Sequence, residues 1–259
     1  MHIVRFEDAS LSSIKSRETE GVSRNFIGAA LSRASGPQAY IAELAPGSRI
    51  PSHFHDVDQF QVFVRGTGRI GKDTWHAGIF HYADAFTPYG PLVPDPGSEM
   101  HFFTLRPAAA SGVFRMPDSR ELIGNRRGRN VVSNIKICAA AGPELVMRVE
   151  PLMSLRDDGV AGDALHIPAD MEFLEDAPAT STQFAIVLTG AIHVGSDRLG
   201  PLSLICVEPG EKMPPLVAPG EGAVVLRLRF GNASDRPGSD PGELEKRDMD
   251  AKYMLPDDY

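Results

Sequence analysis

Cysteine is nearly absent from this sequence, which excludes a fold held together by disulfides. The chain has 259 residues and only two cysteines, Cys138 and Cys206, which share no close-spaced motif. A disulfide framework needs several cysteines at short, regular spacings. We therefore expect both thiols to be small buried side chains in a reducing compartment.

Long apolar runs are also missing. A membrane-spanning helix needs roughly 18 or more consecutive apolar residues, and no run of that length occurs. The N-terminal segment, MHIVRFEDAS, carries Glu7 and Asp8 where a signal peptide needs an uninterrupted apolar stretch. These absences predict a soluble, cytoplasmic protein with no membrane partner.

Basic residues are also fewer than acidic residues. The 26 Lys and Arg residues against 34 Asp and Glu residues give a formal net charge of −8. A nucleic-acid-binding surface needs a basic face that neutralises phosphates, so we expect no nucleic-acid partner. The sequence has no nucleophile elbow of the form G-x-S-x-G, and its segment 65–69, RGTGR, lacks the following helix of a phosphate-binding loop.

Turn-forming residues, by contrast, are abundant. The chain has 25 glycines and 21 prolines, and hydrophobic residues make up 42% of it. Short segments rich in Val, Ile, Phe and Leu and bounded by Gly or Pro are typical of strands. Such segments occur at 39–44, 60–65, 75–82, 101–105, 184–188 and 224–229. Evenly spaced short strands with many turns predict an all-β sandwich or barrel.

The sequence contains an internal duplication. Residues 59–71, QFQVFVRGTGRIG, match residues 183–195, QFAIVLTGAIHVG, at a constant offset of 124 residues. Gln59, Phe60 and two glycines recur identically, and the same offset carries the tripeptide PLV at 91–93 onto 215–217. A match that keeps its register over about 35 residues indicates two copies of one unit.

The duplication predicts the domain organisation. We expect an N-terminal unit over 1–110, a linker over 111–130, a second unit over 131–230 and a polar, acidic tail over 231–259. The linker includes Pro117 and Gly124, so at most a short helix is expected there.

The segment 46–71 carries the residues with the clearest chemistry. His53 and His55 are two residues apart, so on a strand both imidazoles point to the same side. Gln59 has the same parity. Two same-face imidazoles followed by an oxygen donor form most of a site for a first-row transition metal. The spacing alone also fits the polar outer face of a strand, so it leaves two interpretations open.

This segment resembles the first signature of the cupin family, G-x(5)-H-x-H-x(3,4)-E-x(6)-G. The glycines at both ends, His53 and His55 fit its spacing, and Gln59 stands at the acidic position. The second signature contains P-x-G-x(2)-H, and the segment PYGPLV at 88–93 matches it up to Val93 at the histidine position. The resemblance covers both copies. It implies an all-β bicupin, two tandem cupin β-barrels of the RmlC-like jelly-roll type.

The resemblance also implies a metal site with altered ligands. In metal-binding cupins the ligands are the two histidines and the glutamate of the first signature and the histidine of the second. Carried over, these positions are His53, His55, Gln59 and Val93. Glutamine is a ligand in some cupins, such as the manganese hydroxynitrile lyases that this segment resembles. We therefore expect His53, His55 and Gln59 to bind a divalent Fe, Mn, Ni or Zn ion, with His101 as a candidate replacement for the missing histidine.

The second copy departs further from the family pattern. The offset places Ala177 and Ala179 at the histidine positions and Gln183 at the position of Gln59. No metal is expected there, so the second unit is structural, a dimerisation surface or a metal-free pocket. By analogy with other cupins, we expect a homodimer.

The pocket for a small-molecule ligand is expected inside the first unit, where small barrels hold their ligands. The candidate lining residues are Tyr40, Gln61, Phe63 and Tyr89.

Three functions stay open at this point. The first is a metal-dependent enzyme that acts on a small oxygen-bearing or aromatic molecule by dioxygenation, lyase chemistry or isomerisation. The second is a non-catalytic protein that binds a small ligand or regulates, without metal. The third is a metal-free enzyme like the cupin sugar epimerases, which use a His and Tyr pair and need a basic pocket. Arg49, Arg65 and Arg69 are the candidates for that basic pocket.

Overall fold

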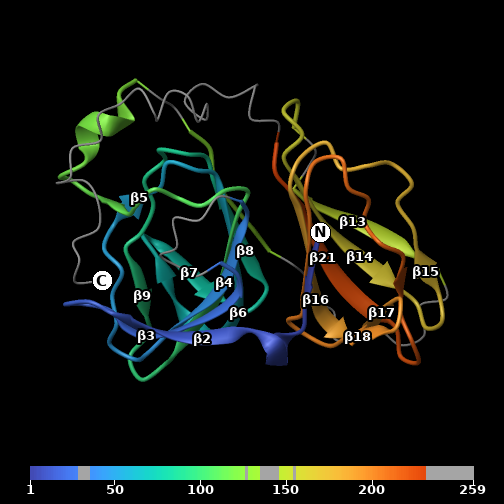
Figure 1. Cartoon of the computed structure of the whole chain (residues 1–259). Coiled ribbons are helices and arrows are strands. Elements are labelled where there is room, and N and C mark those ends of the chain that lie inside the picture. The colour runs from blue at the N-terminus through green and yellow to red at the C-terminus, as the bar shows by residue number, and fades with distance from the viewer. Residues whose placement is uncertain (29–35, 126–127, 135–145, 154–155, 232–259) are drawn as a thin grey trace. The chain divides into compact units, whose positions relative to one another are not determined.

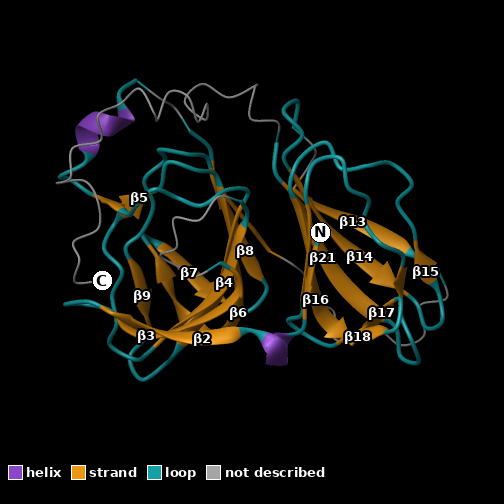
Figure 2. Cartoon of the chain, in the orientation of Figure 1, coloured by secondary structure: helices purple, strands orange, loops and turns teal. Residues whose placement is uncertain are grey.

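Strands dominate the chain. The computed structural model describes residues 1–28, 36–125, 128–134, 146–153 and 156–231; the predicted tail beyond Gly231 and Cys138 lie outside them. Within these ranges the only helical segments are two 3₁₀ turns, Phe6–Asp8 and Arg120–Ile123 (Figure 2). The predicted all-β class is confirmed. No helix in the described ranges is long and apolar enough to cross a membrane.

The chain forms two compact units, which we describe one at a time (Figure 1). The N-terminal unit contains Ser10–Asn134, and the C-terminal unit contains Ile135–Asn232 together with Met1–Ala9. The first nine residues, which fall in the predicted unit 1–110, thus cluster with the second copy. There β1 (His2–Val4) pairs antiparallel with β19 (Leu204–Val207).

A nine-stranded antiparallel sheet forms most of the N-terminal unit. In spatial order its main path is β12 (Asn130–Asn134), β8 (Ile79–Ala83), β6 (Gln59–Ile70), β10 (Met100–Arg106), β4 (Gln38–Leu44), β3 (Glu20–Ile27) and β2 (Ser10–Lys15). Two more strands, β7 (Asp73–His76) and β9 (Leu92–Pro94), also pair with β6. A separate pair joins β5 (His53–Phe54) to β11 (Phe114–Arg115), and β11 lies within the predicted linker.

The C-terminal unit is built from two antiparallel sheets. The larger runs β1, β19, β16 (Gln183–Gly190), β21 (Ala223–Arg229), β14 (Ala161–Ile167) and β13 (Arg148–Met153). The smaller runs β15 (Glu172–Phe173), β20 (Leu216–Val217), β17 (Ile192–Val194) and β18 (Asp197–Leu199). Cys206 on β19 is a free thiol and fully buried, as expected for a small apolar side chain.

The two units repeat the same central strand pair. Leu105 of β10 lies opposite Phe60 of β6, and Leu228 of β21 lies opposite Phe184 of β16. Each pair has one register shift, at His101/Phe102 in the first unit and at Val187/Thr189 in the second. Because Phe60 and Phe184 are also partners in the sequence repeat, the duplication in sequence is a duplication of structure.

One predicted strand is divided. The segment 75–82 was expected to be continuous, but β7 ends at His76 and β8 begins at Ile79. A turn at Ala77 and Gly78 separates them, and Gly78 has a φ of +95°. Glycine adopts this backbone conformation readily because it has no Cβ. Both strands still contribute to the core, where Trp75 and Ile79 are buried.

The repeated glycines Gly66 and Gly190 generate a stability prediction. Gly66 has a φ of +83°, and a Cβ atom there would collide with the carbonyl oxygen of Glu99 on the neighbouring chain segment. Gly190 is in the same situation against Gly222. We expect Gly66→Ala to lower the free energy of unfolding by about 3 kcal/mol, because left-handed strain and the collision add.

Gly97→Ala is the matched control. Gly97 also has a positive φ, +76°, but nothing lies within 4 Å of an added Cβ. The Gly97→Ala substitution should therefore lower the free energy of unfolding only by the cost of the backbone strain, about 1 kcal/mol. Urea denaturation followed by the fluorescence of Trp75, the sole tryptophan, measures both variants. Equal losses in the two variants would show that the contact with Glu99 is unimportant.

Candidate functional site

A cavity of about 290 Å³ lies inside the N-terminal unit. Strands β2, β3, β4, β6 and β10 line it from the main sheet, and the segments around β5 and β9 together with residues 110–113 complete the wall. Part of this wall is apolar, including Ile50, Leu92 and Phe102. Elsewhere the wall is polar, and five side chains meet there in what we call the arginine cluster: His53, His55, Gln59, Tyr89 and Arg106.

Both histidines of the cluster have their tautomer fixed by the backbone. The Nδ1 atom of His53 lies 2.7 Å from the carbonyl oxygen of Pro51, and that of His55 lies 2.8 Å from the carbonyl oxygen of Gly112. A carbonyl oxygen only accepts hydrogen bonds, so Nδ1 carries the proton in each ring. The Nε2 lone pairs of both rings are therefore available as acceptors.

Arg106, the last residue of β10, is the centre of the cluster. Its Nε donates to Oε1 of Gln59 at 3.0 Å, its Nη1 to Oε1 of Gln38 at 3.0 Å, and its Nη2 to Nε2 of His55 at 2.9 Å. The residue is only 3% exposed. The guanidinium lies 5.7 Å from the ring centroid of Tyr40. Among the described residues, the groups that accept hydrogen bonds from this buried cation are all neutral.

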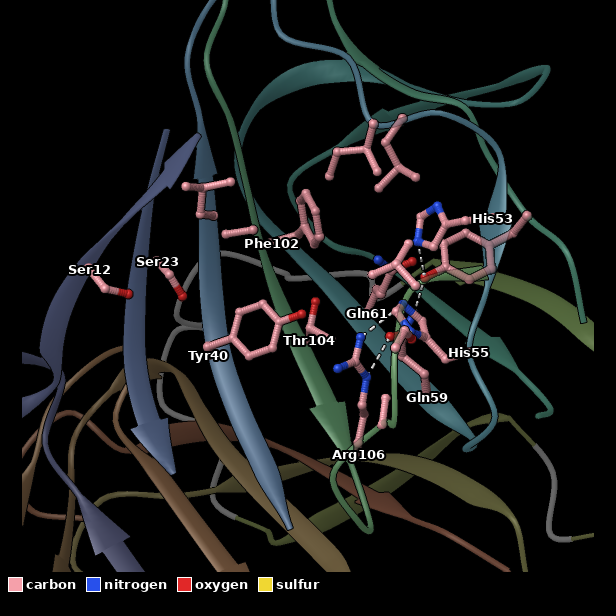
Figure 3. Close-up of a pocket in the computed structure, with 18 of the residues that line it drawn as sticks. Ser12, Ser23, Tyr40, His53, His55, Gln59, Gln61, Phe102, Thr104 and Arg106 are labelled. Atoms are coloured by element: carbon pink, nitrogen blue, oxygen red, sulfur yellow. Dashed lines mark hydrogen bonds between the residues drawn. The ribbon is translucent and has the colours of Figure 1, made fainter. Parts of the chain in front are cut away.

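Gln59 and Tyr89 extend this network to the other histidine. Because the amide oxygen of Gln59 accepts from Arg106, its Nε2 points toward Tyr89 and donates to the hydroxyl at 2.7 Å. The Tyr89 hydroxyl in turn donates to Nε2 of His53 at 2.9 Å. In Figure 3 the side chains of His53, His55, Gln59 and Arg106 lie together on one side of the cavity. Each of the two Nε2 lone pairs and the Gln59 amide oxygen therefore has a protein donor.

Burial sets the protonation of the cluster. Burial, and secondarily the charge of Arg106, lowers the pKa of His53 to about 4 and that of His55 well below its usual value. Burial also raises the pKa of Tyr89 above its usual value. Near neutral pH both imidazoles and the phenol are uncharged. The guanidinium is the one formal charge in the arginine cluster.

This charge has no acidic partner in the part of the chain that the structure describes. The hydrogen bonds of Arg106 go to Gln38, Gln59 and His55, and no ion pair to a described carboxylate accompanies them. Arginine is rarely buried without a paired charge. A buried and uncompensated cation at a cavity wall is the main electrostatic feature of this site.

In the C-terminal unit the equivalent arginine has a charged partner. Arg229 follows Leu228 on β21 as Arg106 follows Leu105 on β10, so the two arginines are structural counterparts. Arg229 is paired with the carboxylate of Asp163 at 2.8 Å. Asp163 lies opposite Arg227, which forms its own ion pairs with Asp163 at 2.8 Å and Glu175 at 3.0 Å. In that unit the buried cationic charge is compensated by internal carboxylates.

Tyr40 occupies the position of Asp163 in the N-terminal unit. Tyr40 lies opposite Thr104 on β10, as Asp163 lies opposite Arg227 on β21. The counterpart of an internal carboxylate is therefore a phenol that faces the cavity beside Thr104 (Figure 3).

Most of the residues singled out in the sequence come together here. Six line the same cavity: Tyr40, His53, His55, Gln59, Gln61 and Tyr89. The Oε1 atom of Gln61 is 3.0 Å from Nδ1 of His81, which holds this side chain in place.

His101 and Phe63 are not among the lining residues. On β10 the alternate residues Phe102, Thr104 and Arg106 line the cavity instead. The imidazole of His101 instead lies 3.1 Å from the carboxylate of Glu99. Phe63 packs edge-to-face against Trp75 at 5.9 Å within the core. His101 is thus not placed to replace the missing histidine.

Arg106 and Gln38 are the important residues that the sequence did not reveal. Arg106 stands one position beyond the predicted strand 101–105, where an arginine is most often solvated. Arg49, Arg65 and Arg69, proposed for a basic pocket, are not among the lining residues. The repeat gave no signal for Arg106, because the offset of 124 residues places it on Phe230, and only the strand register makes Arg229 its counterpart.

With Arg106 in this position, the donor set does not fit a divalent metal ion. The described residues contain no group of three or more His, Cys, Asp or Glu side chains arranged to bind a metal. His55 and Gln59 direct their lone pairs at a guanidinium, and His53 directs its own at a hydroxyl. A dication about 4 Å from that guanidinium would be repelled by roughly 8 kcal/mol at an effective dielectric constant of about 20.

Comparisons with known proteins identify similar folds. No protein-family model matches the sequence, and no curated protein matches it. A candidate dioxygenase from Nostoc punctiforme has a TM-score of 0.62 and 13% identity, over 90% of this chain and 83% of that protein. The pirin YhhW from Escherichia coli, solved with nickel(II), has a TM-score of 0.59 and 11% identity, over 89% of this chain and 99% of that protein.

A plant protein has the same degree of similarity. The coconut allergen cocosin has a TM-score of 0.60 and 12% identity, over 90% of this chain and 85% of that protein. Identities this low show the fold alone. The similarity extends over both units, in agreement with the internal duplication.

Acid is expected to destabilise the N-terminal unit through His53. Burial lowers the pKa of His53 to about 4 in the folded chain, whereas an unfolded histidine titrates near 6.5. Between these values the unfolded chain binds a proton that the folded chain does not, so stability falls as the pH drops through this window. At pH 5 the loss for this residue is about 2 kcal/mol.

Urea denaturation at pH 7.5 and pH 5, followed by the fluorescence of Trp75, measures this loss. His53→Gln should reduce the acid-induced loss, while His76→Gln, at an exposed position, should leave it unchanged. An identical loss in His53→Gln and the unsubstituted chain would contradict the assignment.

Proposed function

We propose that this chain, which has a bicupin fold, binds a small organic anion in the cavity of its N-terminal unit without a metal ion. The anionic group of the ligand contacts Arg106, and the apolar remainder lies against Leu92 and Phe102. The observation that carries this proposal is the buried guanidinium at the cavity wall, which has no carboxylate partner among the described residues.

The energetics of burial support an external anion. Removing a charge from water costs several kcal/mol unless a partner compensates it. Neutral acceptors supply part of that compensation, and in the C-terminal unit Asp163 supplies the charge for Arg229. Because Tyr40 replaces this carboxylate in the N-terminal unit, a ligand carboxylate would provide the missing charge.

The hydrogen-bonding capacity of Arg106 supports a carboxylate-like group. A guanidinium has five N–H donors, and the described side chains accept three of them. One N–H remains on each terminal nitrogen. Two parallel donors match the two oxygens of a carboxylate, the contact in which arginine is most selective.

The rest of the cavity limits the ligand to a small molecule with an apolar portion. Its volume of about 290 Å³ is at the lower end of the range for small-molecule sites. The apolar wall at Ile50, Leu92 and Phe102 suits an aliphatic or aromatic body. The hydroxyls of Ser12 and Ser23, from β2 and β3, offer polar contacts at the side opposite the arginine cluster (Figure 3).

A metal-dependent reaction on a small oxygen-bearing or aromatic molecule is the second candidate. It is favoured by the fixed tautomers of His53 and His55, because metal-bound histidines usually donate Nδ1–H to a backbone carbonyl in this way. It requires the guanidinium of Arg106 to leave the atoms that would bind the ion.

Proton transfer by a His and Tyr pair is less well supported. His53 and Tyr89 are hydrogen-bonded at 2.9 Å, as such a pair requires. Burial, however, lowers the pKa of His53 to about 4 and raises that of Tyr89. A proton therefore stays on Tyr89 near neutral pH, and we assign Tyr89 a hydrogen-bonding role.

Calorimetric titration with a panel of carboxylates tests the proposed function. The panel consists of benzoate, phenylacetate, pyruvate and succinate, with the corresponding neutral amides as matched ligands. We expect at least one carboxylate to bind, and Arg106→Gln to weaken it about 100-fold, since losing one partner of a buried charged contact costs 2–5 kcal/mol. Arg65→Gln, at an exposed arginine, should change little. Equal binding of acid and amide would contradict the proposal.

Tyr40→Asp provides a second test. This substitution recreates in the N-terminal unit the carboxylate that pairs with arginine in the C-terminal unit. We expect the new carboxylate to compensate Arg106 internally and to reduce carboxylate binding at least 10-fold. Tyr40→Asn introduces a side chain of the same size as aspartate but without its charge, so this variant should retain most of the binding. Melting temperatures of both variants check that each is folded, and equal binding in the two would count against the role of Arg106.

A further inference from the structure

We infer that Arg106 is an internal cation that takes the place of a metal ion, and that it keeps His53, His55 and Gln59 from binding one. The atoms of this site that were expected to bind a metal ion are thus arranged around a guanidinium. This inference concerns the same cavity as the proposed function but does not depend on whether an anion binds there.

The first argument is the direction of the lone pairs. Backbone carbonyls hold the Nδ1 protons of His53 and His55, so Nε2 is the atom that each ring presents to a cation. Nε2 of His55 and Oε1 of Gln59 accept from Arg106 at 2.9 Å and 3.0 Å. Two of the three atoms expected to bind the metal therefore already bind one positively charged group.

The second argument is charge. The three donors are neutral and, among the described residues, no carboxylate joins them. A divalent ion would add two charges to a buried site that already holds one, whereas the guanidinium spreads a single charge over several hydrogen bonds. The site is suited to one cation, and the chain supplies it.

The third argument comes from the duplicate unit. There the alanines Ala177 and Ala179 replace the two histidines, yet the arginine persists as Arg229. The arginine is therefore the shared element of the two sites and the histidine pair is not. Arg229 sits against Asp163, so that unit offers the same cation without a second set of metal-binding atoms.

The test is metal binding by the full chain before and after removal of the guanidinium. Protein stripped with a chelator is titrated with Ni(II) and with Co(II), by calorimetry and by the visible absorption of bound Co(II). We expect the unsubstituted chain to bind neither ion at this site. Arg106→Met, which keeps much of the side-chain volume but removes the charge, should bind one equivalent, with an affinity at least about 100-fold above the detection limit that the unsubstituted chain sets. The gain should vanish when His53→Ala and His55→Ala are added.

Arg229→Met is the matched control, because it removes the equivalent arginine from the unit that lacks the histidines. It should produce no metal binding. A similar gain in Arg229→Met, or no gain in a folded Arg106→Met, would overturn the inference. Should Arg106→Met not fold, Arg106→Gln serves as the substitute with the same expectation.

Metal binding by the unsubstituted chain tests the inference whether or not the variants fold. One equivalent of tightly bound Ni(II) or Co(II) that is lost in His53→Ala/His55→Ala would overturn the inference directly. The carboxylate titrations, carried out on metal-free protein, test anion binding at Arg106 separately, so failure of this inference is distinguishable from failure of anion binding.

Discussion

A buried guanidinium must be surrounded by hydrogen-bond acceptors, and this requirement organises the site of the N-terminal unit. Gln38, Gln59 and His55 come from three separate segments and supply the acceptors. Since Gln59 gives its amide oxygen to Arg106, its amide nitrogen faces Tyr89, whose proton then faces His53. The orientations of four side chains follow from one cation.

The sequence predicted the fold and most of the cavity wall because both depend on local patterns. Strand parity places His53, His55 and Gln59 on one side, and the repeat reveals the two units. Arg106 could not be predicted, because its burial depends on pairing with Gln38, 68 residues away. His101 was proposed from its position on the predicted strand 101–105, and the structure instead places its neighbour Phe102 at the cavity.

The two units show that one scaffold can compensate an arginine at the same strand position in two ways. Arg229 is compensated within the chain by the carboxylate of Asp163. In the N-terminal unit a phenol at Tyr40 and an amide at Gln38 leave the arginine accessible from a cavity. Arg229 faces Ala161 at the position of Gln38. The duplicated scaffold thus pairs one arginine with an internal carboxylate and places the other at a cavity wall.

The pairing of β1 with β19 has a consequence for the order of folding. His2 lies opposite Cys206, so the edge of the C-terminal sheet joins segments about two hundred residues apart. Contacts of such long range form slowly, because the chain must close a large loop before they contribute. The N-terminal unit needs only the contiguous Ser10–Asn134 for its described strands. During synthesis on a ribosome the N-terminal unit can complete its sheet first. The first residues of the chain, which form β1, can pair only after β19 has been synthesised.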